Sequence, residues 1–370
     1  MKNWYRIVPF NLTREHEQIW IYKDSKGEKC YNVEVFLTKP IDILKLKQNI
    51  VEDFNSNLSK IKSSRKSLFE NKNNLESVSS CPVCNYETDS SKEVFRVYGA
   101  TYNQCSNCTH VFLIERPTKE ALDDFYSKDK KYQSTYADTK TTETRVQQVS
   151  IPKLEWVISI YKKIYGREPK SILDVGAGSG HFCFACRERG LRADGVEISE
   201  SGNSFCEKHF GFSLINKDFI QSYGDFKNYE IITFWGVIEH ISNPLAMLDA
   251  AHKLLSGKKG LIVTQVPRWN SFGTSVQKIF NDSIVRHLDP LGHINCFTDL
   301  SHATAYNLCG FNIKAAWYFG MDIYEFILQT SNFMNNDKII KEMGPYIPFL
   351  QDEMDLAMLS DGMIFIGIPS

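Results

Sequence analysis

Four cysteines have the spacing of metal ligands. Cys81 and Cys84 form one C-x2-C pair, Cys105 and Cys108 form a second, and the stretch FRVYGATY between the pairs is expected to form two strands. Two such pairs allow four thiolates to meet around one Zn²⁺ in a closed, structural site. Because the sequence begins without a secretory signal, we expect its ten cysteines to be thiols in a reducing, cytoplasmic compartment.

A glycine-rich turn follows a predicted buried strand. The sequence SILDVGAGSGH places Asp174 before Gly176, Gly178 and Gly180, and glycines are needed where a backbone turns tightly and a ligand approaches it. The dinucleotide fingerprint requires a small residue where this chain has His181. A carboxylate such as Asp174 repels a pyrophosphate but attracts a cationic ligand that carries an amino group. The turn therefore favours a cationic cofactor over a dinucleotide.

Two further carboxylates follow the next predicted strands. Glu197 closes the second strand, RADGVEI, where a carboxylate can accept hydrogen bonds from both hydroxyls of a ribose. Asp218 follows the expected third strand, FSLIN, and could accept a hydrogen bond from an adenine amino group. Together with the turn LDVGAGSG and the stretch TFWGVIEHISNP, in this order, these residues resemble the class I S-adenosylmethionine (SAM) dependent methyltransferases over roughly residues 151–319.

The resemblance implies SAM as the cofactor. The three glycines would line its methionine and ribose part, and the backbone around Trp235 and Gly236 would contact its amino acid end. VIEHISNP is similar to the branch that contains ubiquinone-biosynthesis O-methyltransferases and many small-molecule and sugar methyltransferases. The cysteine segment resembles the zinc-binding part of methyltransferases from sugar and surface-polysaccharide pathways. Ubiquinone-type enzymes carry a metal-binding carboxylate where this chain has Gly236, so we expect no catalytic metal.

Three side chains are candidates for the transfer step. Glu239 and His240 come just past the fourth predicted strand, and His293 lies in a loop before a helix that we expect to be capped by Thr298. A sugar hydroxyl is a poor nucleophile at neutral pH, so a positioned base must accept its proton, and histidine suits this task. We expect His240 to be the base and Glu239 to orient its ring, with His293 as the rival base.

Strands and helices alternate from about residue 151, which predicts a Rossmann-like, doubly wound α/β sheet whose ligands bind beyond the carboxyl ends of its strands. The apolar stripe of a helix expected after Pro40 packs either on the chain's own core or in a homodimer contact. The expected parts of the chain are N-terminal strands with this amphipathic helix (1–79, role unknown), the zinc ribbon (80–118), a helical, tyrosine-rich connector (119–150), and the methyltransferase domain with a helical insert at about 320–359 (151–370).

Composition narrows the substrate class. The 370 residues include 43 Lys and Arg against 44 Asp and Glu, and this balance offers no bulk attraction for nucleic acid. No apolar run is long enough to span a membrane. We expect a cytoplasmic methyltransferase that acts on a sugar, a nucleotide-linked sugar or a similar hydroxylated small molecule, by O-methylation or else C-methylation. The alternative is a zinc-ribbon partner protein that binds SAM without turnover.

Overall fold

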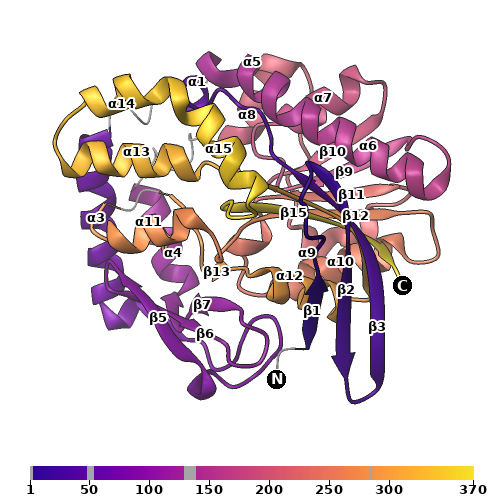
Figure 1. Ribbon diagram of the computed structural model, residues 1–370, viewed down its shortest axis with the longest axis horizontal. Coiled ribbons are helices and arrows are strands. Elements are labelled where there is room, and N and C mark those ends of the chain that lie inside the picture. The colour runs from indigo at the N-terminus through magenta and orange to yellow at the C-terminus, as the bar shows by residue number, and fades with distance from the viewer. Residues whose placement is uncertain (1–2, 48–53, 129–138, 284–285) are drawn as a thin grey trace.

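A nine-stranded sheet runs through the computed structural model, which describes residues 3–47, 54–128, 139–283 and 286–370 (Figure 1). In spatial order the strands are β1 (Trp4–Ile7), β2 (Glu15–Asp24), β3 (Gly27–Leu37), β14 (Phe311–Phe319), β15 (Gly362–Pro369), β12 (Leu261–Pro267), β11 (Ile231–Trp235), β9 (Ser171–Val175) and β10 (Arg192–Val196). The four strands from β12 to β10 are parallel, whereas β15 runs antiparallel to both of its neighbours. The predicted doubly wound α/β fold is confirmed.

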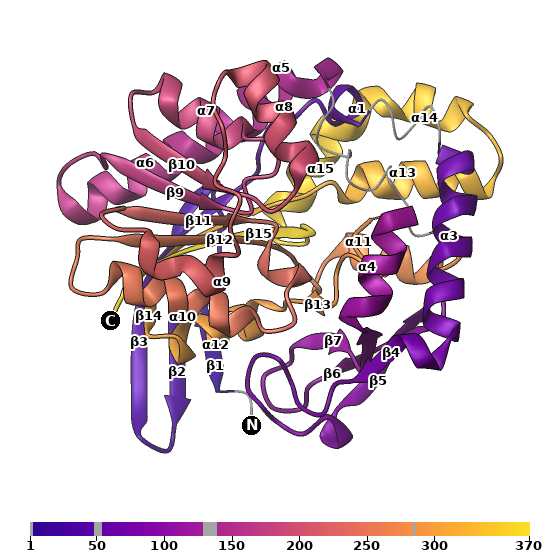
Figure 2. The ribbon, with the colours of Figure 1, turned by 180° about the vertical axis from the view of Figure 1, so that it is seen from behind.

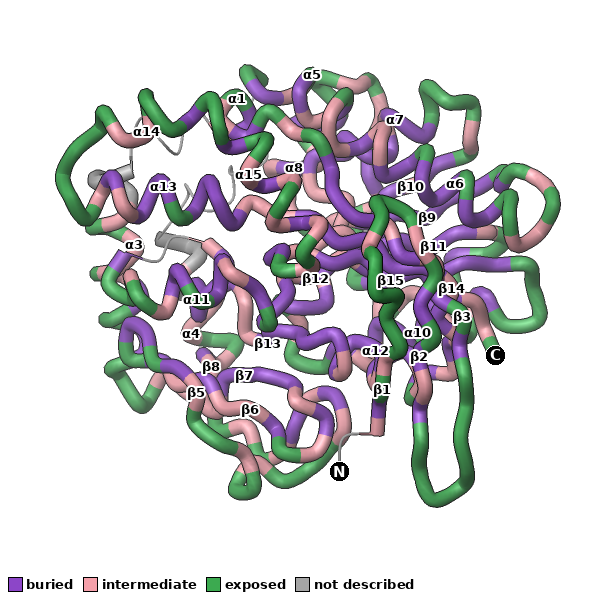
Figure 3. Tube along the Cα trace, viewed as in Figure 1, coloured by how far each residue is buried: buried purple, intermediate pink, exposed green. Residues whose placement is uncertain are grey.

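Helices cover both faces of the parallel strands. One face carries α6 (Ile151–Tyr165) and α7 (His181–Glu188). The other face carries α9 (Phe219–Ser222), α10 (Pro244–Leu255) and α12 (Asp299–Leu308). Thr298 caps α12 as expected, because its side chain accepts a hydrogen bond from the backbone of Ser301. The buried strands between the two helix layers form the core of the domain (Figure 3).

The prediction of a third strand at FSLIN (212–216) is wrong. Only Ile215 pairs, through a single parallel bridge to Val196 at the end of β10. The helix before it, α8 (Glu200–Phe210), ends at Gly211 in the left-handed conformation, and Phe212 then packs on Phe210. Because the segment is used first to end the helix and cover it, too few residues remain to extend the sheet.

The N-terminal strands extend the central sheet, whereas the sequence suggested a small sheet of their own. They are antiparallel to one another, as expected, and β3 pairs in parallel with β14. Without β3, strand β14 would be an open edge with unpaired backbone groups. The outer hairpin of β2 and β3 projects beyond the rest of the sheet and its tip is exposed (Figures 1 and 3).

The amphipathic segment after Pro40 forms α1 (Ile43–Leu46) and α3 (Phe54–Glu70), and the part between them, including Ile50, lies outside the described residues. Ile43 and Leu46 are buried and Leu58 is partly buried against the C-terminal helices, and Ile61 is partly buried against the cysteine-bearing segment. These described residues of the stripe therefore pack on the chain's own core. A dimer contact stays a prediction.

The C-terminal segment forms three helices between β14 and β15. They are α13 (Asp322–Phe333), α14 (Lys338–Met343) and α15 (Ile347–Leu356). Together with α11 (Phe272–Ile279), α1 and α3 they lie beyond the carboxyl end of the parallel strands, where the doubly wound fold binds its ligands (Figures 1 and 2). Among the described residues no helix has the length and apolar content that a membrane crossing requires.

The last strand should be essential for stability. Strand β15 lies between β12 and β14 and pairs with both, so deleting residues 361–370 leaves two buried strands with unpaired backbone groups. We expect this truncation to be insoluble or to lack a cooperative thermal transition. Deleting Ser370 alone, which lies beyond the strand, is the control and should leave the melting temperature nearly unchanged. A soluble 361–370 truncation that melts like the full chain would contradict the prediction.

Candidate functional site

The glycine turn leaves room for a ligand at one position. Gly176, Gly178 and Gly180 all have positive φ angles, of 72°, 57° and 80°. A Cβ at Gly176 would lie 2.5 Å from a methyl group of Val237, whereas a Cβ at Gly178 would meet no heavy atom within 4 Å. The first glycine is therefore required by packing against the segment that leads to Glu239. The second is favoured by its positive φ, and the space beside it is open to a ligand.

Asp174 is a buried carboxylate at the end of β9. Its side chain accepts a hydrogen bond of 2.7 Å from the hydroxyl of Thr233, and the residue is 2% exposed. Burial raises the pKa of Asp174 to about 7, although the Thr233 hydrogen bond and the charge of Lys153 act in the opposite direction. A cationic group placed beside Asp174 would recover the solvation that the carboxylate loses on burial.

Glu197 is tied to the glycine turn. One of its carboxylate oxygens accepts a hydrogen bond of 2.8 Å from the backbone of Gly178, and the other accepts one of 2.8 Å from the backbone of Ser199. This places the carboxylate directly beside the open position of the turn. Asp218 is exposed and caps α9 by accepting a hydrogen bond from the backbone of Gln221, so the structure gives it a local role that needs no ligand.

Trp235 is the last residue of β11, and Gly236 follows it at the same end of the sheet. The Trp235 ring packs on Phe182, and the ammonium of Lys153 lies 4.5 Å from the ring centroid. Lys153 was not a candidate from the sequence. The available signal was its place on the buried stripe of α6, three residues before Trp156, where an apolar side chain is expected.

Glu239, His240 and His293 converge beyond β11. His240 Nδ1 lies 2.6 Å from the carbonyl of Gly292, and His293 Nδ1 lies 2.7 Å from the carbonyl of His287. Each ring must donate from Nδ1 to its carbonyl, so both Nε2 atoms are left as acceptors. His240 Nε2 lies 3.9 Å from Glu239, and the two ring centroids are 5.0 Å apart.

The Gly292 carbonyl holds the Nδ1 proton of His240, and Glu239 lies on the Nε2 side of the ring. Glu239 is 2% exposed, and one of its oxygens has no hydrogen-bond partner among the described residues. Burial raises the pKa of Glu239, and burial together with the nearby His240 lowers the pKa of His293 well below its usual value. Ligand atoms of the three residues lie within 4.8 Å of one another, so they could hold a metal ion, which the sequence did not suggest.

The cysteine segment folds against this cluster. Its strands β5 (Lys92–Val97), β6 (Ala100–Gln104) and β7 (Val111–Leu113) join β13 (Asn295–Cys296) in a four-stranded sheet, flanked by the pair β4 (Leu75–Ser77) and β8 (Glu115–Pro117). The Tyr102 hydroxyl donates a hydrogen bond of 2.9 Å to the carbonyl of His293. The loop that carries His293 is therefore fixed by the cysteine segment.

The four candidate thiols meet at one point. Cys81 and Cys108 have their sulfurs 3.6 Å apart, as do Cys84 and Cys105, and all four sulfurs lie within 4.8 Å of one another. A tetrahedral zinc with Zn–S bonds of roughly 2.3 Å requires sulfurs roughly 3.8 Å apart. Hydrogen bonds from Cys108 and Cys81 lower the pKa of Cys105 to about 7, which favours a thiolate there. The arrangement fits a zinc ion.

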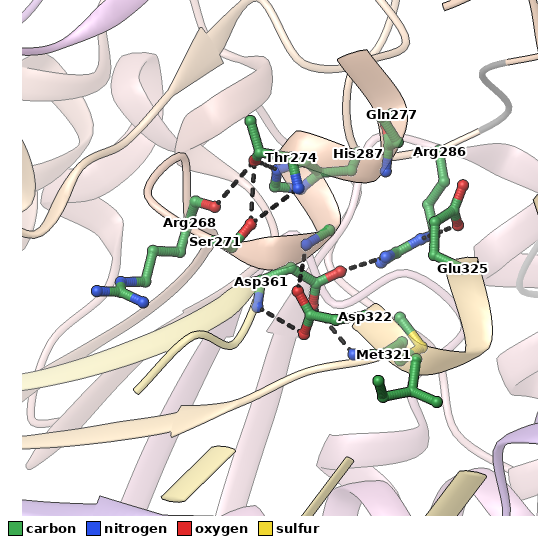
Figure 4. Close-up of polar contacts among 12 residues, drawn as sticks. Arg268, Ser271, Thr274, Gln277, Arg286, His287, Met321, Asp322, Glu325 and Asp361 are labelled. Atoms are coloured by element: carbon green, nitrogen blue, oxygen red, sulfur yellow. Dashed lines mark hydrogen bonds and ion pairs between the residues drawn. The ribbon is translucent and has the colours of Figure 1, made fainter. Parts of the chain in front are cut away.

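His287 belongs to a separate polar cluster, drawn in Figure 4. Its Nε2 lies 2.7 Å from the hydroxyl of Thr274, and burial lowers its pKa to about 4. In the same cluster Arg286 pairs with Asp361 and Glu325. His287 therefore supports the loop through its side chain and reaches the site through its carbonyl, which holds His293.

Comparisons with known proteins find similarity in part of the chain. Residues 156–315 match the family model described as "Methyltransferase domain". A curated relative, the ubiquinone biosynthesis O-methyltransferase of Saccharophagus degradans, is 26% identical over 92 residues, which are 23% of this chain and 39% of the relative. The chain thus matches well under half the length of that relative.

Similar solved structures were also found. The plantazolicin methyltransferase BamL, in complex with a triazolic desmethylPZN analog and SAH, is 18% identical with a TM-score of 0.46, covering 66% of this chain and 92% of that one. The magnesium protoporphyrin IX methyltransferase ChlM from Synechocystis PCC 6803, with bound SAH, is 13% identical with a TM-score of 0.43, covering 68% and 100%. Residues 156–315 thus match a methyltransferase domain model, and in the structure they contribute the four parallel strands of the doubly wound sheet.

Proposed function

We propose that the protein transfers a methyl group from SAM to a hydroxyl of a sugar, a nucleotide-linked sugar or a similar hydroxylated small molecule. O-methylation is favoured, with C-methylation as the second possibility. The observation that carries the proposal is the position of the acceptor-side cluster next to the glycine turn. Val237, which packs on Gly176, is two residues before Glu239, so the cofactor turn and the candidate base are joined by one short segment.

The chain's own residues can move the proton that such a transfer releases. SAM, when bound, supplies a methyl group on a positively charged sulfur. His240 keeps its Nδ1 proton on the Gly292 carbonyl, so Nε2 is free to accept the proton of the acceptor hydroxyl. The resulting imidazolium would face Glu239, whose nearest oxygen is 3.9 Å away, and the carboxylate would stabilise that charge.

The sugar class rests on resemblance. The segment VIEHISNP is similar to a branch that includes many small-molecule and sugar methyltransferases, and the cysteine ribbon is similar to that of methyltransferases from sugar and surface-polysaccharide pathways. The reducing compartment is supported by the cysteines, because all ten are free and the candidate zinc ligands require reduced sulfur. We accordingly propose a cytoplasmic location, a small-molecule acceptor and a structural zinc at Cys81, Cys84, Cys105 and Cys108.

Turnover should depend on His240. Incubation with labelled SAM and a panel of nucleotide sugars should add one methyl group to an acceptor. His240→Ala should lower turnover by about 10²- to 10⁴-fold, the usual contribution of a general base, and should remove the acidic limb of the pH profile. SAM affinity should change little.

The exposed His209 provides a matched control, since His209→Ala should behave like the wild type. Should His240→Ala be active and His293→Ala inactive, the base is His293. A different outcome is that EDTA abolishes turnover, with His240→Ala and His293→Ala both failing to bind Mn²⁺. That result would make Glu239, His240 and His293 metal ligands rather than a general base and its partners. A wild type that methylates no acceptor of the panel would count against the sugar class.

Cofactor affinity should depend on Glu197. Replacing it by alanine removes a charged acceptor beside the open position of the turn, and this should weaken SAH binding by roughly 1.5–3 kcal/mol. Calorimetric titration measures the loss, and circular dichroism checks that the turn still folds. The exposed Glu200, three residues further on, is the matched control. Equal affinity in Glu197→Ala and the wild type would remove the assignment.

One zinc per chain should copurify with the protein. Cys84→Ser should abolish zinc binding and loosen the ribbon, because structural zinc supplies much of the folding energy of such small modules. The central sheet should persist, but turnover should fall because β7 of the ribbon pairs with β13 beside His293. Elemental analysis and limited proteolysis report both effects. Cys30→Ser, at an exposed cysteine outside the cluster, should retain the metal. Zinc-free protein from a chelator-free purification would refute the site.

A further inference from the structure

Two lysines are buried on the α6 side of the sheet, and among the described residues neither lies within ion-pair distance of a carboxylate. Lys39 is 8% exposed and Lys153 is 7% exposed. The ammonium of Lys39 has no hydrogen-bond partner among the described residues, and the ion pairs found between those residues include neither lysine. An unpaired charge is costly in the protein interior. Their burial therefore needs a reason that the folded chain alone does not supply.

Each of the two lysines packs its ammonium group against aromatic rings. The ammonium of Lys39 lies 4.7 Å from the ring centroid of Phe319 at the end of β14, and that of Lys153 lies 4.5 Å from the ring of Trp235 at the end of β11. Trp317 contacts Lys39 at 5.9 Å and also packs on Trp156 of α6, one turn after Lys153. Both ammonium groups thus face the carboxyl ends of the strands on the α6 side of the sheet.

Electrostatic effects agree with this proximity. Burial and the charge of Lys153 lower the pKa of Lys39 well below its usual value. Burial also lowers the pKa of Lys153 to about 8, against an opposing effect of Asp174, and the charge of Arg145 lowers it further. Three cationic side chains and one carboxylate therefore influence one another across a small region of low polarity.

The backbone that presents Lys39 is strained. Thr38 has a φ of 74°, which is rare for a β-branched residue. Two hydrogen bonds hold Thr38 in this conformation. Its N–H donates to the backbone carbonyl of Tyr318 at 3.0 Å, and its own carbonyl accepts from the indole N–H of Trp317 at 2.8 Å. Strain of this kind costs about 1–3 kcal/mol and occurs preferentially at ligand sites. Here it turns the chain after β3 so that Lys39 lies over the sheet.

We propose that Lys39 and Lys153 form an anion subsite beside Asp174 that receives a carboxylate or phosphate of the bound ligand. The inference rests on the proposed function. The anion that we expect at the subsite is the α-carboxylate of SAM. An amino acid carries its ammonium and its carboxylate on one carbon, so a ligand whose ammonium meets Asp174 presents its carboxylate close by. The N-terminal segment, whose role the sequence left open, then completes the site by supplying Lys39.

Calorimetry with two ligands tests the subsite. Lys39→Met and Lys153→Met keep the length of the side chain and remove its charge. Each should weaken SAH binding about 10- to 100-fold, the effect of losing a charged hydrogen bond. Binding of 5′-methylthioadenosine, which lacks the amino acid part, should be unchanged. Without ligand Lys39→Met should melt at or above the wild-type temperature, because a buried charge without a hydrogen-bond partner among the described residues is gone.

Lys162→Met, an exposed lysine on the same helix, is the matched control and should bind SAH like the wild type. If SAH affinity is unchanged but inorganic phosphate raises the melting temperature of the SAH-saturated wild type and not of the variants, the subsite stands and its anion belongs to the acceptor. The subsite is refuted if neither ligand distinguishes the variants, or if SAH and 5′-methylthioadenosine weaken equally. A wild type that binds neither nucleoside refutes the proposed function itself.

Discussion

The pairing of β13 with β7 is the contact on which the acceptor side of the site depends. Asn295 and Cys296, which follow the loop of His293, pair with strand β7 of the cysteine segment. The Tyr102 hydroxyl adds a hydrogen bond to the His293 carbonyl. The neighbouring Gly292 carbonyl in turn fixes the ring of His240. Backbone groups of a single short loop thus set the orientation of both imidazoles, and the loop keeps its shape only while the cysteine segment is folded against it. The four-cysteine cluster and the cluster of Glu239, His240 and His293 are therefore coupled through strand pairing and through hydrogen bonds to the backbone of one loop.

Buried ion pairs join the N-terminal strands to the rest of the domain. Asp299, at the start of α12, accepts hydrogen bonds from Arg6 of β1, from Arg268 after β12 and from the Tyr318 hydroxyl of β14. Burial raises the pKa of Asp299, but the two arginines outweigh it and hold the pKa well below its usual range. Removing one partner of such a pair leaves a buried charge uncompensated, at a cost of about 3–5 kcal/mol. The strands of residues 4–37 are therefore part of the same cooperative structure as the sheet, although their sequence suggested a separate unit.

Local chemistry could be predicted from the sequence, and long-range placement could not. The cysteine pairs, the glycine turn and the Thr298 cap are encoded within a few residues, since spacing and backbone conformation decide them. The strand FSLIN failed because its apolar residues serve the packing of α8, a use that strand propensity does not distinguish from pairing. No sequence pattern pointed to Lys39 as a site residue. Its position depends on the pairing of β3 with β14 and on the strained backbone of Thr38, and both arise from contacts between residues far apart in the chain.

A buried carboxylate at the start of α13 helps to hold the helical insert to the site. Asp322, the first residue of α13, accepts a hydrogen bond of 2.6 Å from the backbone of Gly273 in α11 and one of 3.0 Å from the backbone of Asp361 before β15 (Figure 4). The Asp361 side chain in turn pairs with Arg286, which stands in the loop that leads to His293. A displacement of α13 would break bonds to α11, to the last strand and to that loop together, and each broken bond would leave a buried polar group unsatisfied. The insert and the acceptor-side loop therefore cannot shift independently, so the space beyond the carboxyl ends of the strands is bounded by elements that move as one unit.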